Sequence, residues 1–297
     1  QVTGTPSANV GRFIPAFFDT SVLAGCSAFT YSGQPMTVTA TAKATGGGTT
    51  TNYSGANWAR QLTLTDANGV AGSFTAGNTL PAASFSSGAA SNSTTTFTFT
   101  SPTTAPSSIR LRASEPPLAD GISSAIGTEG TQTIRSGRIR LQNAYGSELL
   151  ATGLPLPTLL EYFDTAPSGW RAGTDTCTNL VAANFAFTAA APSCSAAVAG
   201  CTTALAVTAT GAGPYKAPWT VNLAKPTSAG SMCIRLNLDG TAAGNQCLAT
   251  GTPGSAATSA AMPWLKFGWT GATPSNPAAS VVFGSFKSPL IYRRENY

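Results

Sequence analysis

Hydrophobic and polar residues alternate along several short segments of the chain. Residues 36–44 (MTVTATAKA) carry an apolar side chain at every second position, and residues 61–69 (QLTLTDANG) do the same before they reach a turn. Residues 93–101 (STTTFTFTS) and 108–115 (SIRLRASE) repeat this alternation. A period of two is typical of strands with one buried face. No segment keeps a helical period over three turns, so the pattern predicts an all-β protein.

The segments between the predicted strands are rich in Gly, Ser, Pro and Ala, at spacings expected of a β-sandwich. Residues 65–77 (TDANGVAGSFTAG), followed by a Phe/Thr strand and IRLRAS, resemble the Ig-like repeats of bacterial surface proteins such as invasin-type adhesins. The resemblance implies an Ig-like sandwich that ends near Ile134. We therefore expect two antiparallel, Ig-like β-sandwich domains. The first spans residues 1–135 with an N-terminal extension, and the second spans residues 136–297 and holds most of the cysteines.

Three arginines are concentrated where the second domain is expected to begin, in RSGRIRLQNAYGSELL (135–150). Arg138 and Arg140 share one face of a period-two pattern, and Ile139 and Leu141 share the other. An anion-binding site is one interpretation. The pattern favours a structural strand whose Ile139 and Leu141 face the core, while the arginines face solvent or a carboxylate. On that reading, exchanging both arginines for glutamine should leave the fold intact.

The second half contains further strand signals. CIRLNLDG (233–240) predicts a strand that runs into an Asp-Gly turn, and residues 280–297 predict two strands broken at Pro289. Four tryptophans in this half are either sugar-stacking platforms or packing residues, and packing is the commoner use: Trp170, Trp219, Trp264 and Trp269.

Composition narrows the function classes. Charged residues make up 9% of the chain, against roughly 25% in ordinary soluble proteins. The net charge of +5 is spread thinly, without the clustered Lys/Arg stripe that nucleic-acid binding needs. No apolar run is long enough for a membrane span, and no signal peptide is recognisable. The chain reads as a mature secreted product without a nucleic-acid partner.

The cysteines are six in number, and the chain has no histidine, so Cys/His zinc sites cannot form. Disulfides are favoured over small buried thiols, and they would imply an oxidising compartment. The sequence leaves the connectivity open. Five cysteines lie between 177 and 247 and predict a disulfide-stapled second domain, while the first needs a distant partner or remains free. The six are Cys26, Cys177, Cys194, Cys201, Cys233 and Cys247.

The chain offers few candidate residues for catalysis or for metal binding. Without histidine, a Ser-His-Asp triad or a Cys-His dyad is impossible. Glycoside hydrolysis would need a carboxylate pair, for which the candidates are Glu161 with Asp164 and Asp19 with Asp66. A calcium site at Asp66, Asn68 and Asp239 is conceivable, but these are turn residues first. We expect neither an enzyme nor a cofactor.

A set of short segments, taken in order, resembles one family. The segments are CSAFTYSGQPMTVTATA (26–42), TTTNYSG (49–55), GRIRLQNAYGSELL (137–150) with LPLP (154–157), GW (169–170) before DTCT (175–178), PWL (263–265) and IYRRENY (291–297). They are similar to the C-terminal region of MshQ-like proteins, which are encoded with the mannose-sensitive haemagglutinin type IV pilus system. The resemblance spans nearly the whole chain. It implies an exported, pilus-associated or surface protein, and it supplies no catalytic residue.

Both chain ends are candidates for assembly. A β-sandwich exposes edge strands, and the scarcity of lysine leaves those edges weakly protected against pairing with a neighbour. Strand addition from another copy would satisfy them. The proposed donors are residues 1–20 and 281–292, with the apolar residues Phe13, Ile14, Phe17, Phe18, Val281, Phe283 and Tyr292. The sequence thus predicts a head-to-tail homo-oligomer or homopolymer, with pilus components as possible partners.

Two function classes remain open. The first is an extracellular structural subunit of a surface filament or a pilus-associated assembly. The second is a pilus-tip or surface adhesin for a glycan or host ligand. Termini paired with another copy would favour the first, and an aromatic-lined groove on one domain would favour the second.

Overall fold

The chain divides into two compact units. The structure, a computed structural model, describes residues 14–147, 149, 153–165, 169–181, 184–188, 205–209, 219–225, 229–240, 245–247, 253–255 and 261–284. Unit 1 comprises residues 1–136 and the short segment 163–169, and unit 2 comprises residues 137–162 and 170–297. The division into domains at residues 135 and 136 stays a prediction, and the assignment of the segment 163–169 to unit 1 has no counterpart in it.

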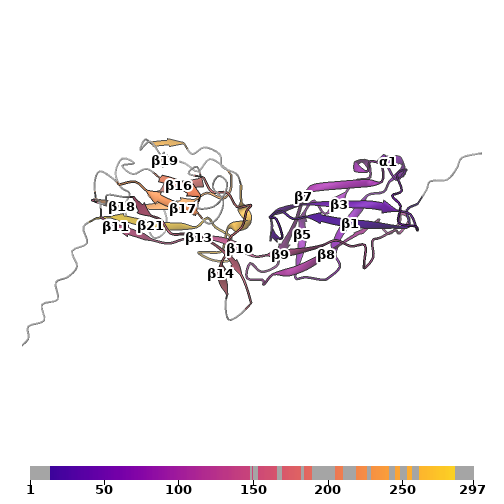
Figure 1. The fold of residues 1–297 in the computed structure, drawn as a ribbon, viewed down its shortest axis with the longest axis horizontal. Coiled ribbons are helices and arrows are strands. Elements are labelled where there is room, and N and C mark those ends of the chain that lie inside the picture. The colour runs from indigo at the N-terminus through magenta and orange to yellow at the C-terminus, as the bar shows by residue number, and fades with distance from the viewer. Residues whose placement is uncertain are drawn as a thin grey trace, which may run out of the picture. The chain divides into compact units, whose positions relative to one another are not determined.

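Unit 1 is built from two sheets (Figure 1). The first has the order β1 (Phe17–Leu23), β3 (Pro35–Lys43), β7 (Ala89–Phe99) and β5 (Gly72–Ala76). The second has the order β2 (Thr30–Tyr31), β9 (Thr131–Arg135), β8 (Ser107–Ser114), β4 (Leu62–Asp66) and β6 (Thr79–Leu80). Two short helical turns, α1 (Gly55–Trp58) and η1 (Ala82–Ser84), lie in the connections.

The alternation of apolar residues determines which face of each strand of unit 1 is buried. In β3 every second residue from Met36 to Ala42 is buried, and in β8 the buried residues are Ile109, Leu111 and Ala113. One core cluster joins residues of both sheets, among them Val38 of β3 and Leu111 of β8. The predicted β-sandwich is therefore present in unit 1, with its core between the two sheets.

The outer edge of β1 is covered by residues of its own unit. The Thr20 backbone N–H donates to the Thr128 carbonyl at 2.8 Å, and the Thr128 hydroxyl donates to the Phe18 carbonyl at 3.0 Å. The Gly130 N–H donates to the Thr20 hydroxyl at 2.9 Å. A Cβ at Gly130 would lie 2.8 Å from the Thr20 carbonyl, so this close approach requires glycine. The segment 128–130 thus protects an edge that would otherwise present unpaired backbone groups.

Unit 2 is also built from strands, in several smaller sheets. One sheet has the order β10 (Gly137–Leu141), β13 (Thr158–Phe163) and β14 (Trp170–Ala172). A second has the order β11 (Ala144–Gly146), β21 (Ala278–Phe283), β18 (Gly230–Leu236) and β15 (Phe185–Thr188). The others are β12 (Leu154–Pro155), β17 (Trp219–Leu223) with β16 (Leu205–Ala209), and β19 (Asn245–Cys247) with β20 (Pro253–Ser255). A helical turn, η3 (Pro263–Leu265), precedes β21.

The all-β prediction is confirmed, with one refinement of strand direction. β2 pairs with β9, and β11 pairs with β21, in the parallel sense, so the sheets are not purely antiparallel as predicted. Each parallel pair joins strands that are distant in sequence, and such pairing leaves no trace in the local alternation. Within the described residues no helix is long and apolar enough to cross a membrane.

Candidate functional site: an arginine pair on a buried glutamate

The strand β10 presents its two faces as the sequence predicts. Ile139 and Leu141 are buried, whereas Arg138 and Arg140 point to the other face. In the antiparallel pairing of β10 with β13, Arg138 stands directly opposite Glu161. The Arg138 Nε donates to Glu161 Oε2 at 2.6 Å, and the Arg140 Nε lies 3.1 Å from Glu161 Oε1. The carboxylate that the sequence analysis left unidentified is Glu161.

The two ion pairs differ in their exposure to solvent. The side chains of Arg138 and Glu161 are only 12% and 7% exposed, whereas that of Arg140 is 38% exposed. The Arg140 Nε forms an ion pair without hydrogen-bond geometry. Arg138 is therefore the buried counter-ion of Glu161, and Arg140 is a weaker, outer partner.

Three aromatic rings surround the Arg138 guanidinium. Its central carbon lies 4.1 Å from the ring centroid of Trp170, 5.0 Å from that of Phe267 and 4.8 Å from that of Trp269. Phe267 packs edge-on against both tryptophans, at 5.0 Å and 5.3 Å. Cation–π contacts of this kind strengthen when the cation is removed from water. Arg138 therefore links β10 and β14 to the segment that follows η3.

Burial lowers the pKa of the Arg138 guanidinium, while the hydrogen bond and the negative charge of Glu161 raise it. The arginine remains charged, because the guanidinium group is not deprotonated in proteins. The cluster joins β10, β13 and β14 to the segment that follows η3.

Unit 1 contains a second arrangement of the same kind. Arg110 and Arg112 occupy alternate positions of β8, and their Nε atoms lie 2.9 Å and 2.7 Å from the two oxygens of Glu129, whose side chain is fully buried. Ser124 donates a further hydrogen bond to Glu129 at 3.1 Å. The role of Glu129 as the partner of both arginines was not predicted from the sequence. The available signal was the shared Arg-x-Arg spacing of IRLR and RIRL, because each pair places two cations on one strand face.

The carboxylates considered for catalysis or calcium binding have structural partners. Asp66 accepts backbone hydrogen bonds from Asn68 at 3.0 Å, Val70 at 2.7 Å and Arg110 at 2.8 Å. Asp19 pairs with Lys43 at 3.4 Å. Asp66 and Asn68 belong to unit 1 and Asp239 to unit 2, so the proposed calcium ligands come from different units. Asp164 accepts a hydrogen bond from the Thr165 N–H at 2.8 Å.

Asp239 lies in the predicted Asp-Gly turn after β18, where Gly240 has a φ of +73°. Its carboxylate binds the Lys266 ammonium group and accepts a hydrogen bond from the Asn276 amide at 2.8 Å. The hydrogen bond from Lys266 lowers the pKa of Asp239 below its ordinary value. Both contacts use the oxygens that a calcium ion would need.

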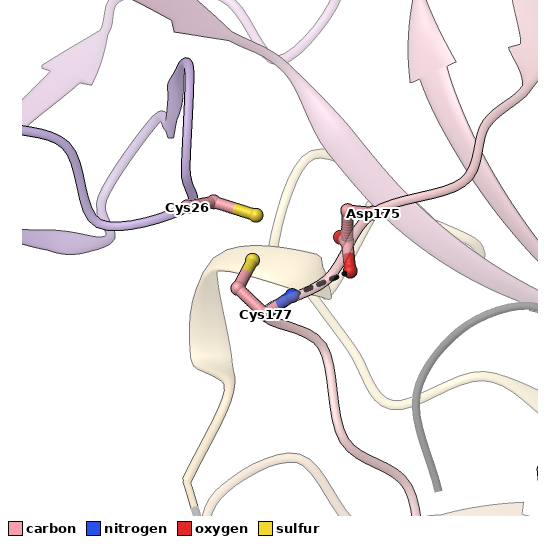
Figure 2. Close-up of side chains that lie close together, drawn as sticks. All are labelled: Cys26, Asp175 and Cys177. Atoms are coloured by element: carbon pink, nitrogen blue, oxygen red, sulfur yellow. Dashed lines mark hydrogen bonds between the residues drawn. The ribbon is translucent and has the colours of Figure 1, made fainter. Parts of the chain in front are cut away.

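The distant partner of Cys26 is Cys177, with which it forms a disulfide. Asp175 accepts a hydrogen bond from the Cys177 N–H at 3.1 Å (Figure 2). It accepts another from the Thr178 N–H at 2.8 Å, and together these bonds fix the turn that carries Cys177. Cys26, Asp175 and Cys177 offer three potential metal ligands, but both sulfurs are in the disulfide and neither is a thiolate. The trio is therefore no metal centre.

The remaining cysteines are described only in part. Cys233 is buried and disulfide-bonded. Cys194 and Cys201 lie outside the described residues, and of Cys247 only the backbone, in β19, is described. Cys177 is thus the distant partner that the sequence allowed for Cys26, and bonds among the other four cysteines stay a prediction.

The terminal residues proposed for assembly lie largely in sheets of their own chain. Phe17 and Phe18 belong to β1, which pairs with β3, and Phe18 is fully buried. Val281 and Phe283 are buried in β21, which has strands on both sides, so this strand has no free edge to donate. Ile14 is exposed, while Phe13 and Tyr292 lie outside the described residues. Exchange of these strands between copies stays a prediction.

Some tryptophans of unit 2 pack inside the fold, and one of them also lines a cavity. Trp219 is buried in β17, and Trp170 contacts Arg138. Trp264 is partly exposed in η3. Trp269 contacts Arg138 and also lines a cavity of about 290 Å³.

Comparisons with known structures give weak likenesses. The chain is 16% identical to FdeC, described as a broadly conserved Escherichia coli adhesin, over 83% of this chain and 66% of that chain, with a TM-score of 0.33. It is 11% identical to domains 5–6 of the S-layer protein SbsC, over 73% of this chain and 89% of that chain, with a TM-score of 0.22. With TM-scores this low, neither likeness supports a conclusion about the fold or the function of this chain.

Family comparisons are more decisive. No curated protein matches the chain. The family model described as DUF6701, third domain, matches residues 1–148, and the one described as DUF6701, fourth domain, matches residues 135–296. Since these matches together extend over nearly the whole sequence, the chain belongs to the DUF6701 family and comprises its third and fourth domains.

Proposed function

We propose that this chain is a structural segment of an exported protein, acting at the cell surface. The observation that carries the proposal is the Cys26–Cys177 disulfide, with Cys233 also oxidised. Disulfides persist in oxidising compartments outside the cytoplasm. The bond connects residues 151 positions apart (177 − 26), so it constrains a large part of the chain.

The surroundings of the polar groups support a structural role over an enzymatic one. The chain has no histidine. Among the described residues, Glu129 and Glu161 are each held by two arginines, and Asp66 and Asp175 each cap a turn. Groups held in this way cannot change partners during a reaction without breaking the local fold.

The finer proposal is a subunit of a surface filament or a pilus-associated assembly. It is supported by the resemblance to MshQ-like proteins and by the free edge of one sheet of unit 1. β5 ends that sheet, and Gly72–Ala76 contains no charged residue and no proline. The edge therefore lacks two of the features that discourage pairing with a strand of another copy, although β5 has a register irregularity between Phe74 and Ala76. An adhesin that binds a glycan is the second proposal, favoured by the cavity beside Trp269.

Two experiments on the native cell test these proposals. Protease treatment of intact cells should cleave the protein, and an alkylating reagent added before lysis should find Cys26 and Cys177 unreactive. A protein that is protected from protease and carries both thiols free would contradict export. Electron microscopy of the native material then separates the finer alternatives. Filaments that contain the chain would support a subunit, and isolated particles would reject it.

A further inference from the structure

A cavity of about 290 Å³ lies in unit 2 beside Arg235 and Ala278, the last residue pair of the β18–β21 register. Its size is at the lower end of the range for small-molecule sites, about 300–1,000 Å³. Its wall is partly apolar, from Leu141, Pro277 and Ala278 together with the Trp269 indole. The polar lining residues are Arg235, Thr270, Ser275 and Asn276.

The position of Arg235 follows from the strand register. Arg235 stands opposite Ala278 in the β18–β21 pair, and its side chain is exposed. Among the described residues it has no carboxylate within ion-pair distance, although it acts on Asp239 through its charge. Asp239 is already engaged by Lys266 and Asn276. The guanidinium of Arg235 is therefore available to an anion that enters the cavity.

The indole of Trp269 forms part of the apolar wall. The ring is held in place by Arg138 and Phe267, so this wall is fixed before any ligand arrives.

The charges around the cavity favour an anionic ligand. Among the described residues that line the cavity, the one charged side chain is the cationic Arg235. A cavity of this size cannot hold a peptide, and its apolar wall suits the C–H face of a sugar ring.

We propose that this cavity binds a single acidic sugar residue, with the carboxylate on Arg235 and the carbon face of the ring against the Trp269 indole. The apolar wall contacts the carbon face of the ring. The cavity thus selects a polyhydroxylated ring that bears one carboxylate. The proposal specifies the ligand of the adhesin alternative above, but it concerns binding by the purified chain and does not depend on where the protein resides.

The test uses the oxidised full chain labelled with ¹⁵N and titrated with D-glucuronate, observed through the tryptophan indole signals. D-Glucose is the neutral control, and acetate is the control for a simple carboxylate. The expected result is a saturable shift of the Trp269 indole signal with glucuronate, at an affinity at least about tenfold above that for glucose or acetate. The signal is assigned by its absence in Trp269→Phe.

Matched variants locate the site. Arg235→Gln should weaken glucuronate binding by about tenfold or more, because a charge-assisted contact is lost. Lys225→Gln removes one exposed cation outside the cavity lining and should bind as the wild type does. Each variant must retain the wild-type melting temperature. The proposal is overturned if glucuronate produces no saturable shift, if glucose or acetate binds as tightly, or if Arg235→Gln binds normally.

Discussion

Replacing Glu161 with glutamine tests how much the arginine cluster stabilises unit 2. The change keeps the size of the side chain and removes its charge. In this variant Arg138 is still a nearly buried cation, 12% exposed, but it has lost the carboxylate oxygen that lies 2.6 Å from its Nε in the wild type. Removing one partner of a buried ion pair costs about 3–5 kcal/mol. The three rings around Arg138 continue to stabilise the cation, so we expect the lower value, about 3 kcal/mol.

The control is Arg140→Gln, which removes the outer partner of Glu161. Arg140 is 38% exposed, and its ion pair lacks hydrogen-bond geometry. Exposed pairs contribute about 0–1 kcal/mol, so this variant should lose no more than about 1 kcal/mol. The contrast between the two variants separates the buried pair from the exposed one.

Urea denaturation followed by tryptophan fluorescence is suited to this measurement. Trp58 is in unit 1, and the other four of the five tryptophans are in unit 2, so the signal reports chiefly on unit 2. A loss of about 3 kcal/mol corresponds to a melting temperature lower by about 6–12 °C for a unit of this size. If Glu161→Gln lost less than about 1 kcal/mol, the description of Glu161 as a buried counter-ion would be wrong.

The remaining predictions concern the core, acid stability and the disulfide. Ile139→Asp should unfold unit 2, seen as loss of its tryptophan signal, because an unpaired buried charge costs several kcal/mol, whereas Ile139→Val should cost about 1 kcal/mol. Because the pKa of Asp239 is lowered in the folded protein, its carboxylate stabilises the fold at pH values above the ordinary pKa, near 3.8. This stabilisation is lost as the pH falls below that value. Asp239→Asn should therefore flatten the fall in stability between about pH 5 and pH 3, and an unchanged slope would contradict this. When single molecules are pulled from both ends, the disulfide keeps residues 27–176 from extending. A Cys26→Ser, Cys177→Ser variant should therefore reach an unfolded length greater than that of the wild type by the length of these residues, and equal lengths would argue against the disulfide.

The sequence predicted those features that depend on neighbouring residues. The alternation in β3, β8 and β10 identified the buried faces, because side chains of a strand alternate between two environments. For β10 it also anticipated that Ile139 and Leu141 are buried while Arg138 and Arg140 meet a carboxylate or solvent. These conclusions needed no knowledge of which strands pair.

Features that depend on pairing between distant segments could not be predicted. Glu161 is 23 residues from Arg138, and the rings of Phe267 and Trp269 come from a part of the chain more than a hundred residues away. The sequence alone suggested that replacing both arginines is tolerated. The burial of Arg138 leads to the opposite expectation, since a double replacement leaves Glu161 buried without a counter-ion.

The cysteine pairing illustrates the same limit. Six cysteines permit fifteen connectivities, and spacing alone does not select among them. The clustering of five cysteines in the second half suggested bonds within that half and either a distant partner or a free thiol for Cys26, but it did not identify Cys177 as that partner. A disulfide requires that two Cβ atoms come close in the folded chain, and only the folded structure shows which ones do.

The proposed role as an exported structural segment is tested most directly by mass spectrometry of the protein taken from its native cell, alkylated before lysis and digested without reduction. We expect a peptide pair joined through Cys26 and Cys177, which disappears on reduction. Recovery of both cysteines as alkylated, unlinked peptides would contradict both the disulfide and the oxidising location inferred from it.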